Sequence, residues 1–259
     1  MSFVIVSEID QVAYVKMHRP DVRNAVNPDM IDQLTETFQK LSIRKDVRLI
    51  AFQGEGKVFC AGADLTWMKS MVNFSFDQNK EDSLKLFQMF ESMMKCSIPI
   101  IGVVQGAAFG GALGLLACCD YVIAEEGTKY CFSEVKLGIA PAVISAFVMP
   151  KVVHGMIRPL MISGDIFENS VALASGLIHK VVPQTEGHTE LQKVIHRMKE
   201  GGPEAAREIK KLLNDLTGLS WEQQKERTTK LIAERRISSE GQEGLKSFLE
   251  KRSPAWMDE

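Results

Sequence analysis

One almost uninterrupted apolar stretch, residues 98–119, constrains the fold more than any other part of this sequence. Gln105 is its only strongly polar residue, and by length alone such a stretch could span a bilayer. However, residues 98–104 are rich in β-branched side chains, as in a buried strand, and five glycines and a proline interrupt the stretch. No basic flank marks a cytoplasmic side. We therefore expect a strand, a loop and a helix in a globular core, and no membrane partner.

Strand-like and helix-like segments alternate along the first half of the chain. Residues 3–7, 12–17 and 47–53 have the composition of short strands, and residues 27–41 and 77–94 carry apolar side chains at helical spacing. Strands interleaved with helices indicate crossover connections and a largely parallel sheet. The pattern predicts an α/β body.

The same alternation continues beyond the glycine-rich segment and then stops. A helix is predicted over residues 111–119, followed by strands over 120–124 and 129–132. From about Ala142 the strand signal fades, and the remainder is typical of charged amphipathic helices. These helices are predicted over residues 187–199, 203–213, 221–236 and 240–251. Because no Pro/Gly/Ser linker separates them from the body, we expect a helical layer on the same core.

Charge, cysteine content and the first residues argue against several classes of protein. The 31 basic and 33 acidic side chains give a formal net charge of −2, which does not attract nucleic acid. The five cysteines include no C-x-x-C pair and no histidine at ligand spacing, so we expect neither disulfides nor a metal site. The chain also begins without the basic region and apolar core of a signal peptide. A cytoplasmic protein with no nucleic-acid partner is expected.

Two glycine-containing loops, residues 59–65 and 105–112, each follow a predicted strand and lead into a helix. Small residues let a ligand approach the backbone, and amides at the start of a helix suit a developing negative charge. Neither loop is a nucleotide fingerprint, because Phe59 stands where a third glycine would be needed, and the chain contains no G-x-x-x-x-G-K or G-x-S-x-G. Taken singly, each loop is more often a tight turn than a catalytic element.

Taken together, the motifs of this chain resemble the crotonase (enoyl-CoA hydratase/isomerase) family along nearly its whole length. The motifs are His18-Arg19-Pro20, Asn24-Ala25-Val26-Asn27, Phe59-Cys60-Ala61-Gly62-Ala63-Asp64-Leu65, Gly106-Ala107-Ala108-Phe109-Gly110-Gly111, Phe132-Ser133-Glu134-Val135-Lys136-Leu137-Gly138 and Ala174-Ser175-Gly176-Leu177-Ile178. Residues 62–68 and 111–115 look most like bacterial methylglutaconyl-CoA hydratases of leucine degradation. The resemblance implies a crotonase-like spiral of ββα repeats over residues 1–195 and a helical trimerisation region over 196–259, in a homotrimer or a dimer of trimers.

The resemblance also implies roles for individual residues. The family's two oxyanion donors match the amides of Ala63 and Gly111, and the second of its two catalytic glutamates matches Glu134. The first glutamate falls on Gly114, which can neither hold nor transfer a proton. An acyl-CoA is the expected substrate, with coenzyme A as part of it and no separate cofactor. The residues expected to contact this substrate are Val22, Arg23, Ala25, Ala61, Gly62, Ala63, Asp64, Leu65, Trp67, Phe109, Gly110, Gly111, Pro141, Phe248 and Lys251.

These groups suit reactions that pass through a thioester enolate. Adding water to a 2,3-unsaturated thioester builds charge on the thioester oxygen, and each fixed N–H donor could lower the barrier by about 3 kcal/mol. A glutamic acid at 134 in an apolar pocket would favour its neutral form and could protonate C2. Without a partner carboxylate, Glu134 has to orient the water alone or with an unidentified group.

A single base also suffices to move a double bond from C3 to C2. We therefore expect an enoyl-CoA hydratase, with an enoyl-CoA isomerase or a non-catalytic acyl-CoA-binding subunit as alternatives. Simpler readings also stay open for individual side chains: Phe248 as a helix core residue, Lys251 as a solvated charge, Asp64 as a helix cap and Trp67 as core. Lys69 is a candidate cation for a distal carboxylate on the acyl chain.

Overall fold

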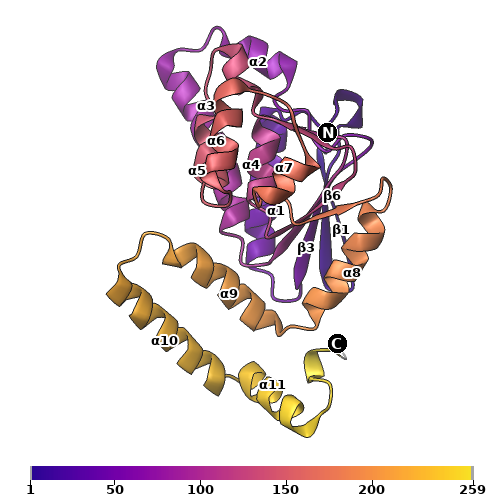
Figure 1. The fold of residues 1–259 in the computed structure, drawn as a ribbon, viewed down its shortest axis with the longest axis vertical. Helices are drawn as coiled ribbons and strands as arrows, with labels where there is room; N and C mark the ends of the chain where they lie inside the picture. The colour runs from indigo at the N-terminus through magenta and orange to yellow at the C-terminus, as the bar shows by residue number, and fades with distance from the viewer. Residues whose placement is uncertain (1, 258–259) are drawn as a thin grey trace.

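The computed structural model describes residues 2–257, and two β-sheets organise them (Figure 1). In the large sheet the strand order is β1-β2-β3-β4-β6-β9, and every pairing except β1 with β2 is parallel. Its strands are β1 Val4–Ile9, β2 Val12–Met17, β3 Leu49–Gly54, β4 Ile100–Val104, β6 Tyr121–Glu125 and β9 Lys180–Val182. The small sheet has the order β5-β7-β8, with β5 Ala107–Phe109, β7 Lys129–Cys131 and β8 Phe167–Glu168. The prediction of a largely parallel α/β body is confirmed.

Helices cover both faces of the large sheet, so its strands carry apolar residues on both sides. In β2, Ala13 and Val15 face the core formed with α1 and α3, whereas Val12 faces α8 together with Leu49 and Ile101. The helices of the body are α1 Pro28–Ser42, α2 Leu65–Met71, α3 Phe76–Met94, α4 Gly111–Ala117, α5 Ala142–Val148, α6 His154–Ser163, α7 Asn169–Ala174 and α8 Gly187–Lys199.

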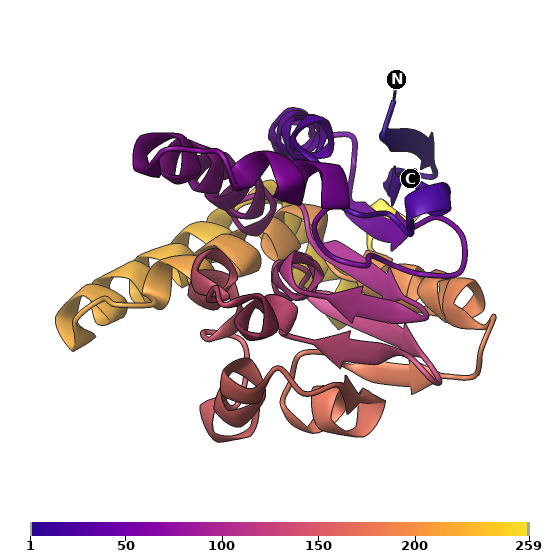
Figure 2. The ribbon, with the colours of Figure 1, turned by 90° about the horizontal axis from the view of Figure 1, so that it is seen from above.

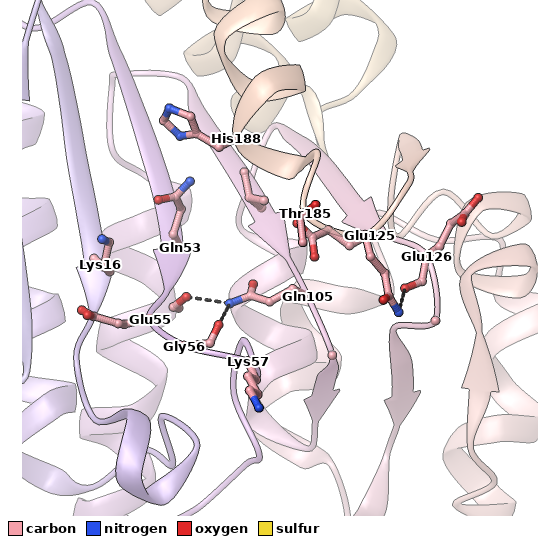
Figure 3. A pocket seen from close by; sticks show the side chains of 15 residues that line it. Lys16, Gln53, Glu55, Gly56, Lys57, Gln105, Glu125, Glu126, Thr185 and His188 are labelled. Carbon is pink, nitrogen blue, oxygen red and sulfur yellow. Dashed lines mark hydrogen bonds between the residues drawn. The ribbon is translucent and has the colours of Figure 1, made fainter.

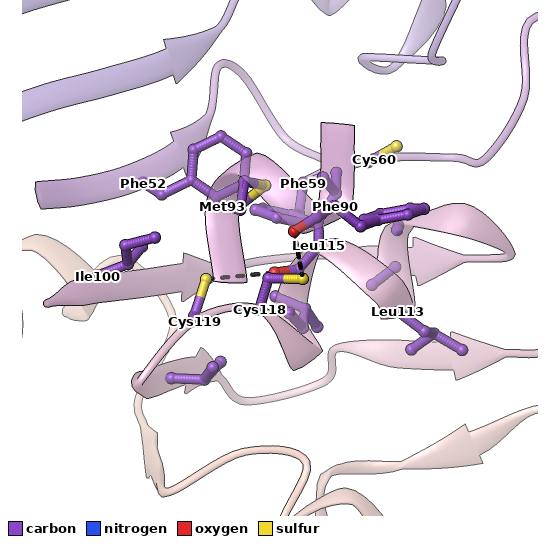
Figure 4. Packing of buried hydrophobic residues seen from close by; sticks show 14 of the residues in the cluster. Phe52, Phe59, Cys60, Phe90, Met93, Ile100, Leu113, Leu115, Cys118 and Cys119 are labelled. Atoms are coloured by element: carbon purple, nitrogen blue, oxygen red, sulfur yellow. Dashed lines mark hydrogen bonds between the residues drawn. The ribbon is translucent and has the colours of Figure 1, made fainter. Parts of the chain in front are cut away.

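The apolar stretch of residues 98–119 lies in this core as β4, β5 and α4. Gly102 lets β4 and the end of α4 pack closely, since a Cβ on it would lie 3.0 Å from Cys119 Sγ. Cys118 and Cys119 are buried beside Phe52, Phe90 and Met93 (Figure 4). Within residues 2–257, no helix combines the length and the apolar character needed to cross a bilayer.

The last three helices leave the body as an arm, formed by α9 Pro203–Leu216, α10 Trp221–Ile237 and α11 Ser239–Glu250 (Figures 1 and 2). In this arm, α9 lies against the body, where the buried Arg207 donates to the carbonyl of Val47 (2.6 Å) and Lys210 pairs with Asp120 (2.8 Å). The arm leaves large apolar side chains exposed, namely Ile209, Leu213, Trp221, Ile232, Ile237, Leu245, Phe248 and Leu249.

Two sequence-based expectations about the second half need correction or refinement. The strand signal was expected to end near Ala142, but β8 and β9 follow it. Both are too short to show periodicity, because they are defined by pairing with β7 and β6 and not by their own composition. In addition, the boundary predicted after residue 195 falls inside α8, whose Leu191 and Val194 pack on the large sheet.

Candidate active site

Three parallel segments carry the expected catalytic groups to one region: strands β5 and β7 of the small sheet and a segment bridged to β5 at Cys60. Cys60 forms a parallel bridge with Ala108 in β5, and β5 pairs in parallel with β7. Ala63 follows the first segment, Gly111 follows the second and Glu134 follows the third. Because parallel strands all point their carboxyl ends to one edge, the three segments open toward the same side.

The first donor loop is fixed on both sides of Ala63. The amide of Val26 donates to the carbonyl of Gly62 (2.8 Å), and the amide of Asp64 donates to the carbonyl of Val26 (2.8 Å). This pairing turns the N–H of Ala63 away from Val26, and within residues 2–257 it donates to no protein acceptor. Gly62 has φ +103°, and a Cβ there would approach the carbonyl oxygen of Phe109 to 3.2 Å. The chain thus leaves one exposed amide free in a rigid turn.

The second donor loop begins α4. Gly110 precedes the helix with φ +55° and donates to the carbonyl of Cys131 (2.8 Å), and Phe109 donates to the carbonyl of Cys60 (3.1 Å). Gly111 is the first residue of α4, so its N–H has no intrahelical acceptor, and no protein acceptor exists for it within residues 2–257. A Cβ added to Gly111 would meet no atom within 4 Å outside its own stretch of helix.

Glu134 lies beside this second loop on a short 3₁₀ helix, η2 Ser133–Leu137. Its Oε1 lies 3.3 Å from the position that a Cβ of Gly110 would occupy, and Ser133 Oγ lies 3.4 Å from the same point. Oε2 is buried and has no hydrogen-bond partner. Burial raises the pKa of the Glu134 carboxyl above its ordinary value, which favours a neutral acid. A buried carboxyl oxygen left without a partner is costly and is typical of a group kept for chemistry.

The position of the absent first glutamate is closed by packing. A Cβ on Gly114 would lie 2.8 Å from two ring atoms of Phe90 and 2.9 Å from Ile144. The Phe90 ring packs against Phe147 with centroids 5.3 Å apart, and Phe87 contacts Phe147 in turn. A side chain at position 114 would therefore require Phe90 and Ile144 to shift, and these two residues form an apolar wall at the position of the absent carboxylate.

The segments expected to hold coenzyme A come together beside the first donor loop. The amide of Ala61 donates to the carbonyl of Arg23 (3.0 Å), which places Val22, Arg23 and Ala25 alongside residues 61–65. Arg23 and Asn24 both adopt left-handed backbone conformations, with φ 54°.

Asn24 has a structural role that the sequence reasoning left unassigned. Its buried amide donates to the carbonyls of Glu55 (2.8 Å) and Val58 (2.9 Å) and so holds the turn to the segment before the donor loop. Asparagine tolerates the left-handed region better than most residues, so its presence in the motif was a usable signal.

Helix α2 carries three of the residues singled out in the sequence: Asp64 is its N-cap, Trp67 lies in its first turn and Lys69 lies in its last turn. The carboxylate of Asp64 accepts from the amides of Thr66 (2.7 Å) and Trp67 (3.3 Å), so it does cap the helix. Trp67 is buried, and its Nε1 donates to Asp82 (3.1 Å) on α3. Lys69 lies exposed in the last turn of α2. Pro141 directly precedes α5, whose Ile144 contributes to the apolar wall.

Two of the expected contacts with coenzyme A are not brought to this region by the chain itself. Phe248 lies on α11 of the arm with 81% of its surface exposed, and Lys251 is the residue directly after this helix. In Figure 1 the arm lies at the opposite end of the molecule from α2. Their predicted role therefore requires a second copy of the chain.

A separate cavity of about 700 Å³ lies at the carboxyl edge of the large sheet (Figure 3). Gln105 lines this cavity, and its side-chain amide donates to the carbonyls of Gly54 (2.7 Å) and Gly56 (3.0 Å). Its lining includes the charged side chains of Lys16 and Glu126 but none of the expected catalytic groups. No group of three or more His, Cys, Asp or Glu side chains within residues 2–257 is arranged to hold a metal ion. Burial raises the pKa of Cys60 to about 12, so this thiol is not a nucleophile.

Comparison with known proteins gives a consistent result. The family model described as enoyl-CoA hydratase/isomerase matches residues 8–259. The crotonyl-CoA hydratase of Syntrophomonas wolfei is 29% identical over 251 residues, which cover 96% of this chain and 95% of that protein.

Solved structures agree in fold. The crystal structure of an enoyl-CoA hydratase from Shewanella pealeana has a TM-score of 0.93 and 35% identity, covering 98% of this chain and 96% of that one. Pseudomonas aeruginosa AtuE has a TM-score of 0.95 at 24% identity over 99% of this chain and 100% of that one, and shows the fold alone. The predicted crotonase-like fold is confirmed.

Proposed function

This chain belongs to the enoyl-CoA hydratase/isomerase family, and we propose that it hydrates the 2,3 double bond of an enoyl-CoA thioester. The observation that carries the proposal is the position of Glu134 beside Gly110: one of its carboxyl oxygens is buried without a partner, and the adjacent amide of Gly111 is free. The names of the relatives agree with this reaction. The roles of individual residues given below are part of the proposal.

In the proposed reaction, the amides of Ala63 and Gly111 donate to the thioester oxygen and stabilise the enolate. Water adds its oxygen to C3, the proton of Glu134 moves to C2, and a proton from the water restores the Glu134 acid. The raised pKa of Glu134 supports this, because a neutral carboxyl has the proton to donate. The fixed backbone of both loops means that the donors need not reorganise as charge develops.

Water needs a second polar contact, and Ser133 is the candidate that the structure offers. Its hydroxyl and Glu134 Oε1 lie 3.4 Å and 3.3 Å from one common point at Gly110. Within residues 2–257 that hydroxyl makes no hydrogen bond to protein, whereas the wall at Gly114 is apolar. We assign Ser133 the task of holding the water that Glu134 activates.

A Δ3,Δ2-enoyl-CoA isomerase is the second candidate, and the apolar wall at Gly114 and Phe90 is the observation that favours it. Isomerisation needs one base that removes a proton from C2 and returns it to C4, and no water. Glu134 alone could do this. A non-catalytic acyl-CoA-binding subunit is the third candidate, but the unpartnered carboxyl of Glu134 argues against it.

The finer parts of the proposal concern acyl chain, assembly and compartment. The resemblance of residues 62–68 and 111–115 favours a branched substrate such as 3-methylglutaconyl-CoA, as in leucine degradation. The exposed apolar side chains of the arm favour an assembly of several copies of the chain. The family resemblance implies a homotrimer or a dimer of trimers, in which Phe248 and Lys251 would reach the coenzyme A of a neighbouring subunit. Five buried, unpaired thiols suit the reducing cytoplasm.

The test is a parallel incubation with crotonyl-CoA, 3-methylglutaconyl-CoA and a 3-enoyl-CoA. Hydration removes the conjugated enoyl absorbance of the first two substrates, whereas isomerisation of the third increases it. Loss of absorbance supports the hydratase, and a gain with the 3-enoyl-CoA alone supports the isomerase instead. If no substrate changes while butyryl-CoA still binds in calorimetry, the binding subunit is correct and both enzyme assignments fail.

A further inference from the structure

Arg19 connects the two backbone segments that fix the first donor amide. Its Nη2 pairs with Asp64 Oδ2 at 2.8 Å, and its Nη1 donates to the carbonyl oxygen of Ala25. Ala25 directly precedes Val26, which hydrogen-bonds to the peptide groups on both sides of Ala63. One guanidinium therefore bridges the segment that carries the donor and the segment that holds it.

The guanidinium itself is well held. The side chains of Arg19 and Asp64 are only 15% and 12% exposed, and the Arg19 Cζ lies 5.0 Å above the Phe3 ring. The backbone amide of Arg19 donates to the side chain of Asn24 (2.9 Å), which fixes the turn between Arg19 and Ala25. A lysine could not reproduce this contact, because a single ammonium cannot make the same fork to a carbonyl and a carboxylate.

The two oxygens of Asp64 have different partners. Oδ1 accepts from the amides of Thr66 and Trp67 and caps α2, whereas Oδ2 faces Arg19. Loss of Arg19 would leave the helix cap in place but would leave a carboxylate unpaired one residue from the oxyanion donor. An unpaired negative charge there would oppose a developing oxyanion, and the loop would lose a fixed contact.

We infer that Arg19 is a positioning residue, which holds the Ala63 amide in line with the thioester oxygen and neutralises Asp64 beside it. The inference rests on the proposed role of Ala63 as an oxyanion donor. It extends the active site to a side chain that touches neither substrate nor reacting atoms.

The experiment measures the infrared carbonyl stretch of bound butyryl-CoA labelled with ¹³C at the thioester carbon, together with kcat and KM on crotonyl-CoA. Wild type should shift the carbonyl to lower frequency, because donated hydrogen bonds polarise it. Arg19→Met should lose a large part of that shift, and kcat should fall about 10- to 100-fold with KM changed less than about threefold. Arg19→Lys should be intermediate in both.

A matched control is Arg44→Met, which removes an arginine that pairs with Glu8 (2.9 Å) and Asp46 (2.5 Å) away from the donor loops. Its carbonyl shift and kcat should equal those of wild type. If Arg19→Met matches wild type in both readouts, the inference is overturned.

If Arg19→Met does not fold, Asp64→Asn decides, because asparagine keeps the helix cap and removes the ion pair. A partial loss of the carbonyl shift supports the positioning role, and an unchanged shift overturns it. Butyryl-CoA does not react, so the infrared arm is independent of hydration. A wild type that shifts the carbonyl but hydrates nothing would reject the proposed function and leave the inference standing.

Discussion

The two sides of the proposed active site deal with polarity in opposite ways. On one side, Glu134 keeps a buried carboxyl oxygen without a partner, next to the hydroxyl of Ser133. On the other side, Gly114 is covered by Phe90 and Ile144 with no space left over. Of these two sides, only the one with Glu134 has a buried polar atom without a hydrogen-bond partner, which is energetically costly. In the proposed mechanism, proton transfer at this site therefore depends on the single carboxyl of Glu134.

Glu134→Gln is the strongest way to break the comparison. The glutamine keeps the size of the side chain and removes its proton chemistry, so kcat should fall by about 10³-fold or more while the affinity for butyryl-CoA stays within about threefold. Steady-state kinetics and calorimetry give the two numbers. Glu126→Gln, which alters a residue of the separate cavity, should leave kcat unchanged. Retained turnover in Glu134→Gln would remove Glu134 from the mechanism.

Gly114→Ala tests the apolar side. The added Cβ would lie 2.8 Å from the Phe90 ring, and we expect a loss of about 1–3 kcal/mol in the free energy of unfolding, with Phe90→Leu recovering part of it. Gly155→Ala is the matched control, because Gly155 is also helical and a Cβ there meets nothing within 4 Å. Urea titration measures both. If Gly114→Ala is as stable as the control, the wall is not packed as described.

Ser133→Ala asks whether the polar side contains a second functional group. Hydration should slow about tenfold, because the water loses one of its contacts, whereas any isomerisation of a 3-enoyl-CoA should not change. Ser92→Ala, which removes a hydroxyl that donates to the carbonyl of Met89 within its own helix (2.7 Å), serves as the control. Equal rates for both variants would mean that Glu134 orients the water alone.

The smallest expected effect is on stability as a function of pH. Because burial raises the pKa of Glu134 in the folded state, the folded protein binds this proton more strongly than the unfolded chain. The free energy of unfolding should therefore fall as pH rises from the ordinary glutamate range through the raised pKa. Glu134→Gln should melt a few degrees above wild type at pH 8 and close to wild type at pH 4 in scanning calorimetry.

Glu168→Gln provides a control of opposite sign. The hydrogen bond from Lys129 lowers the pKa of Glu168, so its contribution is present above the ordinary glutamate pKa and is lost as pH falls. This variant should melt slightly below wild type at pH 8. A Glu134→Gln variant that is less stable than wild type at pH 8 would contradict the uncompensated burial of its carboxyl.

Local signals in the sequence predicted much of the fold. The predicted strand over residues 12–17 and helix over 187–199 have the bounds of β2 and α8, because apolar periodicity and flanking polar residues define both. The helix predicted from residue 77 begins at Phe76, where Ser75 and Gln78 form a capping box. By contrast, β5 is only three residues long and exists through its pairing with β7, which no local pattern reports.

The site was less predictable for a similar reason. Family motifs indicated Ala63, Gly111 and Glu134, and the fold brings their segments to one edge. However, the closure of Gly114 by Phe90 joins residues 24 positions apart, and the pair of Arg19 with Asp64 joins residues 45 positions apart. Contacts of this kind depend on how α3 and the loops pack, and a single sequence contains no periodic signal for them.

Phe90 and Gly114 also limit how this pocket can change by substitution. A glutamate at position 114 requires space that the Phe90 ring occupies, and removing Phe90 first leaves an unfilled cavity beside Ile144. Either single change therefore costs stability before any second carboxylate can act. We therefore expect the two positions to be energetically coupled, so that a glutamate at position 114 destabilises the protein less when a smaller side chain stands at position 90.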